Sequence, residues 1–196
     1  VEVTDARGQT APRTLKIWQR GDEERMVRIT APARLKGVGL LVTRDENVYL
    51  FLPSYPPARR VVGSKRTDAF LGTDFAVEDL SRLEYVDHYD AIVSGSDGDL
   101  TILTLTPRSV TGDKELRLWV DSSAVVHRID HVNEEGSVTR RLVLDEIREI
   151  EGRPIAHHML VTDLANGRQT EARVSHVQID SGLPGIELSV GELENP

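Results

Sequence analysis

The six histidines are the side chains of this chain best suited to bind a metal ion or to transfer protons near neutral pH. His157 and His158 are adjacent, and neighbouring residues of a strand point to opposite faces of a sheet, so they cannot bind one ion together. His127 and His131 share a strand face but lie about 13 Å apart along it, whereas zinc ligands lie about 2 Å from the metal. The sequence therefore predicts ordinary surface or rim histidines and no metal site.

Several short motifs resemble ion-binding or catalytic patterns but lack essential residues. Asp97-Gly98-Asp99 contains part of a calcium loop, without the complete acidic pattern and the closing Glu. Gly63-Ser64-Lys65 and Gly95-Ser96-Asp97 do not form the G-x-S-x-G turn of a serine hydrolase. The chain has no cysteine, which excludes disulfides, thiolate catalysis and cysteine-bound zinc. These observations predict a protein that is not an enzyme and uses no cofactor.

A group of basic residues in this acidic chain is a candidate contact for an anionic head group or an acidic partner. One alternative is a solvated loop that flanks a strand. Another is an internal ion-pair network, in which Arg66 pairs with Asp68 or Asp74 and shapes the segment. The members of this basic patch are Arg59, Arg60, Lys65 and Arg66.

Large apolar side chains in the same part of the chain are candidates to line or plug a ligand cavity. Phe70, Leu71 and Phe75 belong to a segment, residues 53–80, that is neither regular strand nor regular helix and is called the crossover below. Long ordered connections of this kind are often functional. The alternative is that these three residues are simply part of the hydrophobic core. With Tyr55 and Trp18 they make up the predicted ligand-binding set.

The elements that must position these residues are mostly strands. Apolar and polar residues alternate with period two along most of the chain, and the turn Asn166-Gly167 is a strong hairpin signal. The pattern predicts about ten antiparallel strands in one large, strongly curved sheet, an incomplete β-barrel whose open apolar face must be covered. A parity change near Ser175-His176 predicts a β-bulge. The tail from Leu183 to Pro196 is consistent with a short helix or with an irregular packed end.

Helix is scarce and is predicted mainly within the crossover, where it would plug the concave face of the sheet. Phe75 to Ser81 is a candidate short helix, with Thr73 or Asp74 as its N-cap and acidic residues in its early turns. Gly63 and Gly72 are predicted to have positive φ or to lie where a side chain would clash.

Composition narrows the class of protein. The chain has 196 residues, 39% hydrophobic and 29% charged, which is ordinary for one globular domain covering residues 1–196. A net charge of −8 and a pI of about 5.3 argue against a nucleic-acid partner. No run approaches the roughly 18 consecutive apolar residues of a membrane-spanning helix.

A series of short motifs follows one order through the first part of the chain. The motifs are Lys16-Ile17-Trp18, Ile29-Thr30-Ala31-Pro32-Ala33, Lys36-Gly37-Val38-Gly39-Leu40-Leu41, Tyr49-Leu50-Phe51-Leu52-Pro53, Gly63-Ser64-Lys65-Arg66, Phe70-Leu71-Gly72-Thr73-Asp74-Phe75 and Glu78-Asp79-Leu80. This order resembles the outer-membrane lipoprotein-sorting-protein-like family, a branch of the LolA/LolB lipoprotein-carrier superfamily. The match is densest from Leu15 to Leu80, and the later strands match in layout.

The resemblance implies a periplasmic protein with a LolA-like half-barrel, helices plugging its concave face and acyl chains or other lipids bound in a hydrophobic cavity. It implies lipid or lipoprotein acyl chains as partners and an inner-membrane transporter as a further one. Many family members have a helix before the first strand, whereas this chain begins with a strand at Val1. We therefore expect that helix to be missing or removed, together with a signal peptide.

Two other functions remain open at this stage. One is a non-catalytic adaptor or envelope-stress sensor associated with a membrane transporter, and the other is an enzyme acting on lipids. Bound lipid in the native protein would distinguish the carrier from both.

Overall fold

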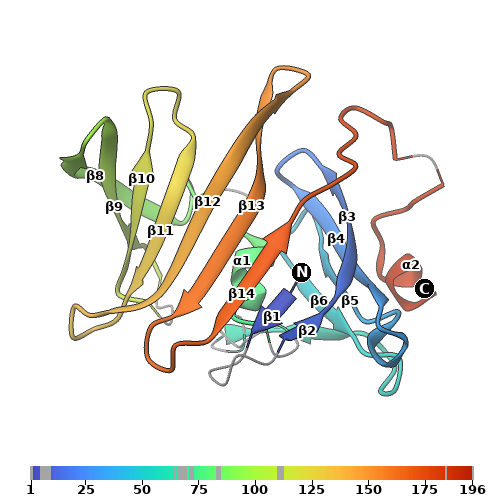
Figure 1. Cartoon of the computed structure of the whole chain (residues 1–196). Helices are drawn as coiled ribbons and strands as arrows, with labels where there is room; N and C mark the ends of the chain where they lie inside the picture. Colours follow the sequence, from blue (N-terminus) through green and yellow to red (C-terminus); the bar gives the residue numbers. More distant parts are fainter. Residues whose placement is uncertain are drawn as a thin grey trace.

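The protein, a computed structural model, is described for residues 2–4, 10–63, 65, 70, 73–82, 85–109, 113–183 and 185–195. These residues form two antiparallel sheets and a few short helices (Figure 1), which confirms the predicted mainly β, antiparallel fold. The prediction of one continuous sheet needs correction, because the strands divide into a nine-stranded and a five-stranded sheet. Alternation indicates which side of a strand is buried, but it does not indicate which strands share hydrogen bonds.

The strands and helices have the following bounds. Across the five-stranded sheet the order is β3 (Thr14–Arg20), β4 (Glu24–Ala31), β5 (Gly39–Val42), β6 (Val48–Phe51) and β7 (Arg59–Val61). Across the nine-stranded sheet it is β2 (Thr10–Pro12), β1 (Glu2–Thr4), β14 (Gln169–Arg173), β13 (Arg153–Asp163), β12 (Val138–Ile150), β11 (Val126–Val132), β10 (Glu115–Val120), β9 (Leu100–Pro107) and β8 (Tyr89–Asp97). The helices are η1 (Ala33–Leu35), a 3-10 helix, α1 (Val77–Ser81) and α2 (Val190–Glu194).

The two sheets adjoin where the chain passes directly from one edge strand to another. β2 lies at one edge of the nine-stranded sheet and β3 at one edge of the five-stranded sheet, and Arg13 alone separates them in the sequence. β2 pairs with β1 whereas β3 pairs with β4, so hydrogen bonding is interrupted at this corner. The second connection between the sheets runs from β7, a short strand within the crossover, to β8. It contains α1, which lies between the two sheets (Figure 1).

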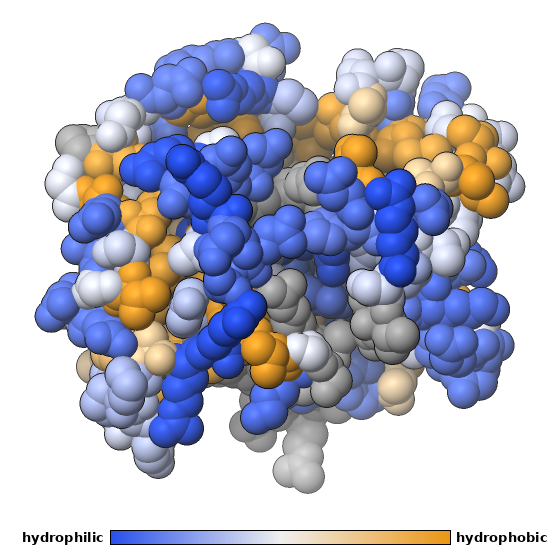
Figure 2. Space-filling view, turned by 180° about the vertical axis from the view of Figure 1, so that it is seen from behind, coloured by the Kyte–Doolittle hydropathy of each residue, from blue (hydrophilic) through white to orange (hydrophobic). Residues whose placement is uncertain are grey.

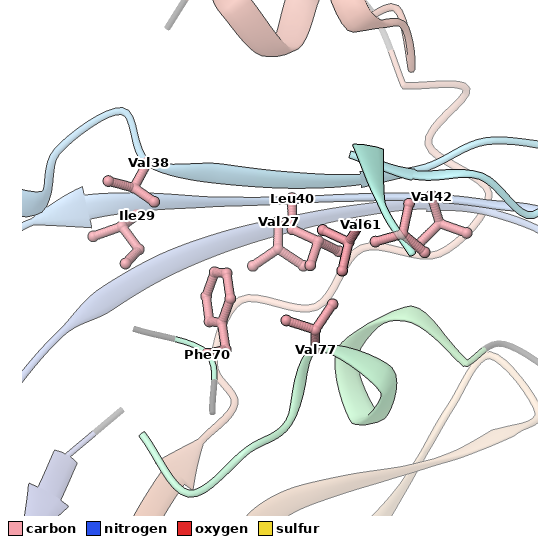
Figure 3. Packing of buried hydrophobic residues seen from close by; sticks show 9 residues of the cluster. Val27, Ile29, Val38, Leu40, Val42, Val61, Phe70 and Val77 are labelled. Atoms are coloured by element: carbon pink, nitrogen blue, oxygen red, sulfur yellow. The ribbon is translucent and has the colours of Figure 1, made fainter. Parts of the chain in front are cut away.

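The central strands of the five-stranded sheet are covered on both faces. On one face, Val27 and Leu40 point toward the crossover, where Phe70 and Val77 pack against them (Figure 3). The alternating apolar residues of β4, β5 and β6 therefore have partners on both sides. The buried residues of this cluster are Val27, Ile29, Val38, Leu40, Val42, Val48, Val61, Phe70 and Val77.

The other face of the five-stranded sheet is covered by the C-terminal tail. Leu193 of α2 is fully buried and packs with Met26 and Leu41. The Arg28 guanidinium donates from Nη2 to the Glu192 carbonyl oxygen at 2.6 Å, in addition to the bond that this carbonyl accepts from the Asn195 backbone N–H at 3.3 Å. Of the two alternatives for the tail, the described residues therefore show the short helix.

Gly39 is the point at which α2 approaches the sheet most closely. A Cβ atom on Gly39 would lie 2.7 Å from Leu193 Cδ1 and 3.1 Å from the Val27 carbonyl oxygen. We expect Gly39→Ala to displace α2 and to lower the free energy of unfolding by about 1–3 kcal/mol. The matched control is Gly95→Ala, because a Cβ there would meet only an ordinary contact at 3.8 Å. Urea denaturation of both variants measures the difference, and equal stabilities would contradict the close packing of α2.

Two local predictions are corrected in the described residues and one is confirmed. β14 ends at Arg173 and His176 has φ of +56°, so the parity change marks the end of a strand instead of a bulge. α1 begins at Val77, and the Thr73 hydroxyl donates to the Phe70 carbonyl oxygen at 2.7 Å instead of capping the helix. Gly63 has the predicted positive φ, +57°, whereas Gly72 lies outside the described residues.

Candidate functional site

The nine-stranded sheet carries a row of apolar residues across the face that contacts α1, called the inner face below. Successive strands place these residues directly opposite one another, so their side chains form one continuous strip. The strip consists of Leu103, Leu118, Ile129, Leu142 and Val161 on β9 to β13.

The crossover covers one end of this strip. Phe75 is buried against Val161 and Ala172, and Leu80 of α1 and Leu142 of the same face both pack against this cluster. Phe70, from the same segment, packs on the five-stranded sheet instead. The crossover is therefore a plug with one aromatic anchor in each sheet, and burying each phenyl ring contributes about 1.5–3 kcal/mol.

Asp74 holds this plug against β14 through hydrogen bonds, which corrects the prediction that Asp74 caps the helix. The N-cap of α1 is Ala76, whose backbone N–H donates to Asp79 Oδ2 at 2.7 Å. The Asp74 carboxylate, in a residue only 4% exposed, accepts hydrogen bonds from Arg168 Nε at 2.9 Å and Nη2 at 2.6 Å. Its second oxygen accepts a hydrogen bond from the Thr170 hydroxyl at 2.8 Å.

A buried ion-pair cluster centred on His131 also holds the plug on the nine-stranded sheet. This corrects the prediction of a surface or rim histidine at this position. His131 is 4% exposed, and its Nδ1 lies 2.6 Å from Asp113 Oδ2. Its Nε2 lies 3.6 Å from Asp79 Oδ1, which also accepts a hydrogen bond from Arg140 Nη2 at 2.9 Å. Asp79 belongs to α1 and the basic residues to β11 and β12, so the cluster holds the helix on the sheet.

The same cluster contains donor atoms of the kind that bind cations. Glu78, Asp113 and His131 each offer one such atom within 4.8 Å of the others. Burial raises the pKa of the Glu78 carboxyl above its ordinary value, although the nearby Arg82 acts to lower it. Arg140 Nη2 already lies 3.1 Å from both ring nitrogens of His131, so a side chain supplies the positive charge that a metal ion would bring. We interpret these residues as an ion-pair cluster.

Aromatic residues border the inner face beyond the end of α1. The Arg82 guanidinium carbon lies 4.9 Å from the centre of the Tyr89 ring and 5.9 Å from that of Tyr85, within the range of cation–π attraction. Burial raises the pKa of Tyr85 and of Tyr89 to about 12, so both phenols are neutral at physiological pH.

Burial lowers the pKa of Arg25 to about 10, and its Nη1 donates to the Leu80 carbonyl oxygen at 2.8 Å. This bond ties the plug to the five-stranded sheet as well.

Part of the inner face remains accessible beyond the plug. Leu103, Val120, Val126 and Leu144 pack on the buried inner-face cluster but are only partly buried themselves. Figure 2 shows apolar side chains gathered at the upper right of the rear view, on the side of the molecule where Figure 1 places β8, β9 and β10. These four residues define the inner surface, an apolar area next to a helical plug held by ion pairs.

The structure places the predicted ligand-binding residues in three different environments. Phe70 and Phe75 are buried within the plug. Trp18 packs on the opposite face of the five-stranded sheet, in the cluster that contains α2. Tyr55 is exposed in the turn after β6. Leu71 lies outside the described residues. The fold thus buries Phe70 and Phe75 against the two sheets, whereas Trp18 and Tyr55 lie elsewhere.

The basic patch is partly described. Arg59 and Arg60 are exposed at the start of β7, an edge strand of the five-stranded sheet, and Lys65 is exposed after it. Arg66 lies outside the described residues, so its predicted ion pair with Asp68 or Asp74 does too. The basic side chain that pairs with Asp74 in the described part of the chain is Arg168.

The outer face of the nine-stranded sheet carries a separate polar hollow of about 470 Å³. Trp119 forms part of its wall, and the Arg128 guanidinium carbon lies 3.9 Å from the centre of the indole ring. Arg128 and Arg141 both donate two hydrogen bonds to Asp130, which is almost completely buried. The charges in this hollow are therefore paired with one another.

A two-sheet antiparallel fold with a helical plug against an apolar inner face places this protein in the class of LolA-like half-barrels. A protein-family model described as "Uncharacterized protein" matches residues 21–195, so the chain belongs to that family. A search of curated protein sequences found no match. Among the described residues, no helix has the length and apolar character needed to cross a bilayer.

Three solved structures share this fold. An outer membrane lipoprotein-sorting protein domain from Vibrio parahaemolyticus superposes with a TM-score of 0.84 at 19% identity, covering 98% of this chain and 88% of the other. A DUF1329 family protein from Desulfovibrio piger gives 0.79 at 22% identity, with coverages of 93% and 83%. A LolA superfamily protein from Nitrosomonas europaea gives 0.71 at 18% identity, with coverages of 90% and 84%.

Proposed function

We propose that this protein is a periplasmic carrier that binds the acyl chains of a lipid or lipoprotein on its inner surface. The observation that carries the proposal is the accessible apolar area formed by Leu103, Val120, Val126 and Leu144 beside the plug. The lipoprotein-sorting and LolA descriptions of two structural neighbours support it.

The physical basis of binding is the transfer of hydrocarbon out of water. Each buried CH₂ group of an acyl chain contributes about 0.8 kcal/mol, so an apolar surface holds a lipid without any catalytic group. Phe70 and Phe75 would extend this surface if the plug moved away from either sheet, because each ring is anchored on a different one. The basic patch, Arg59, Arg60 and Lys65, is the candidate contact for an anionic head group or for an inner-membrane transporter that supplies the lipid.

Binding of a fluorescent fatty-acid probe to matched variants of β9 tests this proposal. Leu103 and Ile102 are adjacent and both partly buried, but Leu103 belongs to the inner strip and Ile102 lines the outer hollow. We expect Leu103→Asn to weaken probe binding about tenfold, because it places a polar amide in the path of the acyl chain, and Ile102→Asn to leave binding unchanged.

Circular dichroism and urea denaturation identify any variant that is unfolded. Equal losses in the two variants would show that the probe does not use the inner surface. The proposed carrier function would be contradicted if the wild-type protein bound no acyl probe and carried no lipid after native purification.

A second candidate function is a non-catalytic adaptor or envelope-stress sensor. It is favoured by the exposed edge of the nine-stranded sheet at β8, which offers a protein-binding surface that does not involve the inner surface.

A further inference from the structure

We propose that β8 is a docking edge for an extended segment of a partner protein, one with an uncharged centre flanked by basic residues. β8 is the last strand of the nine-stranded sheet and pairs only with β9 within the described part of the chain. Along an edge strand, every second residue directs its N–H and C=O groups outward, where they are available to another strand.

The side chains of β8 differ from those that protect most edge strands. Eight of its nine residues are exposed, including Ile92 at 64% and Val93 at 70%, which point to opposite faces of the sheet. From Ala91 to Ser96 the strand has no Lys, Arg or Pro, the residues that usually prevent edge pairing. Between Ala91 and Ser96 the protective feature is a bulge between Val93 and Gly95, and the residues before it remain regularly paired with β9.

The other sheet edges are short or charged. β2 and β7 have three residues each, and β3 carries Lys16 and Arg20. An added strand of six residues or more therefore fits β8 better than these edges.

The acidic residues near the two ends of β8 indicate which kind of segment would bind there. Acidic residues stand on both sides of the uncharged stretch: Asp87 and Asp90 before it, and Asp97 and Asp99 after it. Asp90 pairs with Arg108 at 3.0 Å, whereas Asp87 and Asp99 are exposed and form no ion pair among the described residues. The two ends of the edge thus attract a segment that carries positive charge on either side of its centre.

The same charges disfavour a second copy of this chain. In an antiparallel pairing that places Val93 opposite itself, Asp87 of one copy approaches Asp99 of the other at both ends. In the pairing that places Ile92 opposite itself, Asp87 approaches Asp97. Like charges in such positions are destabilising, and the net charge of −8 on each copy adds to the repulsion.

The test uses fluorescein-labelled decapeptides and anisotropy. The probe is KKTVTVTVKK, and EETVTVTVEE has the same centre with acidic ends. We expect the basic peptide to bind about tenfold more tightly at low salt, and the difference to shrink at high salt. Two further basic peptides carry N-methyl groups on alternate backbone nitrogens. One peptide is methylated at its odd-numbered residues and the other at its even-numbered residues. Only the peptide whose methyl groups replace the N–H hydrogens that would face β8 should lose binding, because a strand pairs through every second residue.

Variants of the protein locate the site. Val93→Lys adds a protective charge to the edge, and Leu164→Lys adds the same charge at an exposed position in the turn between β13 and β14. We expect about a tenfold loss for the first and no loss for the second. Equal binding by both variants, or equal binding by both N-methylated peptides, would overturn the proposal. Sedimentation that shows a dimer broken by Val93→Lys, without peptide binding, would identify a second copy as the occupant and overturn it too.

Discussion

Asp74→Ala is expected to lower the free energy of unfolding by about 3–4 kcal/mol, well beyond the loss of a helix cap. The carboxylate of Asp74 is buried and accepts three hydrogen bonds, two from Arg168 and one from the Thr170 hydroxyl. The substitution removes all three and leaves the Arg168 guanidinium, partly exposed, without its acid. Urea denaturation at neutral pH measures the change.

The matched control is an aspartate–arginine pair of similar length on the surface. Asp180 Oδ2 lies 3.2 Å from Arg153 Nη2, with both side chains well exposed, so Asp180→Ala should cost less than about 1 kcal/mol. A double-mutant cycle that adds Arg168→Met isolates the coupling between Asp74 and Arg168. If Asp74→Ala were no more destabilising than Asp180→Ala, the plug would not be held to β14 in the way described.

Asp130→Asn is expected to cost about 3 kcal/mol at pH 7 and much less in acid. Burial acts to raise the pKa of Asp130, but hydrogen bonds and charges from Arg128 and Arg141 outweigh it, and the net pKa lies below the ordinary value. A carboxylate with a depressed native pKa contributes stability above its unfolded pKa, about 3.9, and loses it as pH falls through the native pKa. The difference between wild type and Asp130→Asn should therefore be constant from pH 7 to about pH 5 and shrink below about pH 4.

Glu146→Gln is the control for this pH profile. Glu146 also contacts two arginines, Arg148 and Arg173, and its pKa is lowered chiefly by the hydrogen bond from Arg173. Its side chain is exposed to solvent, so the substitution should change stability far less than Asp130→Asn at every pH. A stability difference for Asp130→Asn that does not depend on pH would show that Asp130 contributes by shape alone.

Features that depend on neighbouring residues could be predicted from the sequence. The Asn166-Gly167 signal corresponds to the turn between β13 and β14, where Gly167 has φ of +69°. Asp97-Gly98-Asp99 corresponds to the turn between β8 and β9, and Gly98 has φ of +58°. In both turns the residue types alone specify the conformation, because glycine adopts positive φ at little cost.

Features that depend on distant partners could not be predicted. Asp74 has the composition and position of an N-cap, but Arg168, 94 residues later, competes for its carboxylate. Alternation along β11 places His131 on the apolar inner face, and a polar residue at such a position was the available signal for a buried cluster. Its partners come from three other segments, however, and nothing in the local pattern links Asp79, Asp113 and Arg140.

The candidate site shows the same limit. Phe70 and Phe75 could be assigned to a plug because they stand together in an irregular segment, whereas Trp18 could be assigned to either face of its strand. The inner surface itself comes from β9 to β12, where the sequence pattern resembles that of any half-buried strand. Which half-buried positions stay partly accessible depends on where the plug ends, and that is a property of the tertiary structure.

The pairing of β1 with β14 has a consequence for the order in which this protein folds. Glu2 pairs with Glu171 and Thr4 with Gln169, so β1 lacks this hydrogen-bonding partner until the chain has been made as far as β14. The hairpins of the five-stranded sheet, by contrast, join residues close in sequence, and such contacts form fastest. During synthesis the meander from β3 to β7 can therefore assemble early, while its second apolar face stays uncovered until α2 is made. The emerging chain thus exposes that face until α2 has been made, which makes it the surface that a chaperone would have to shield.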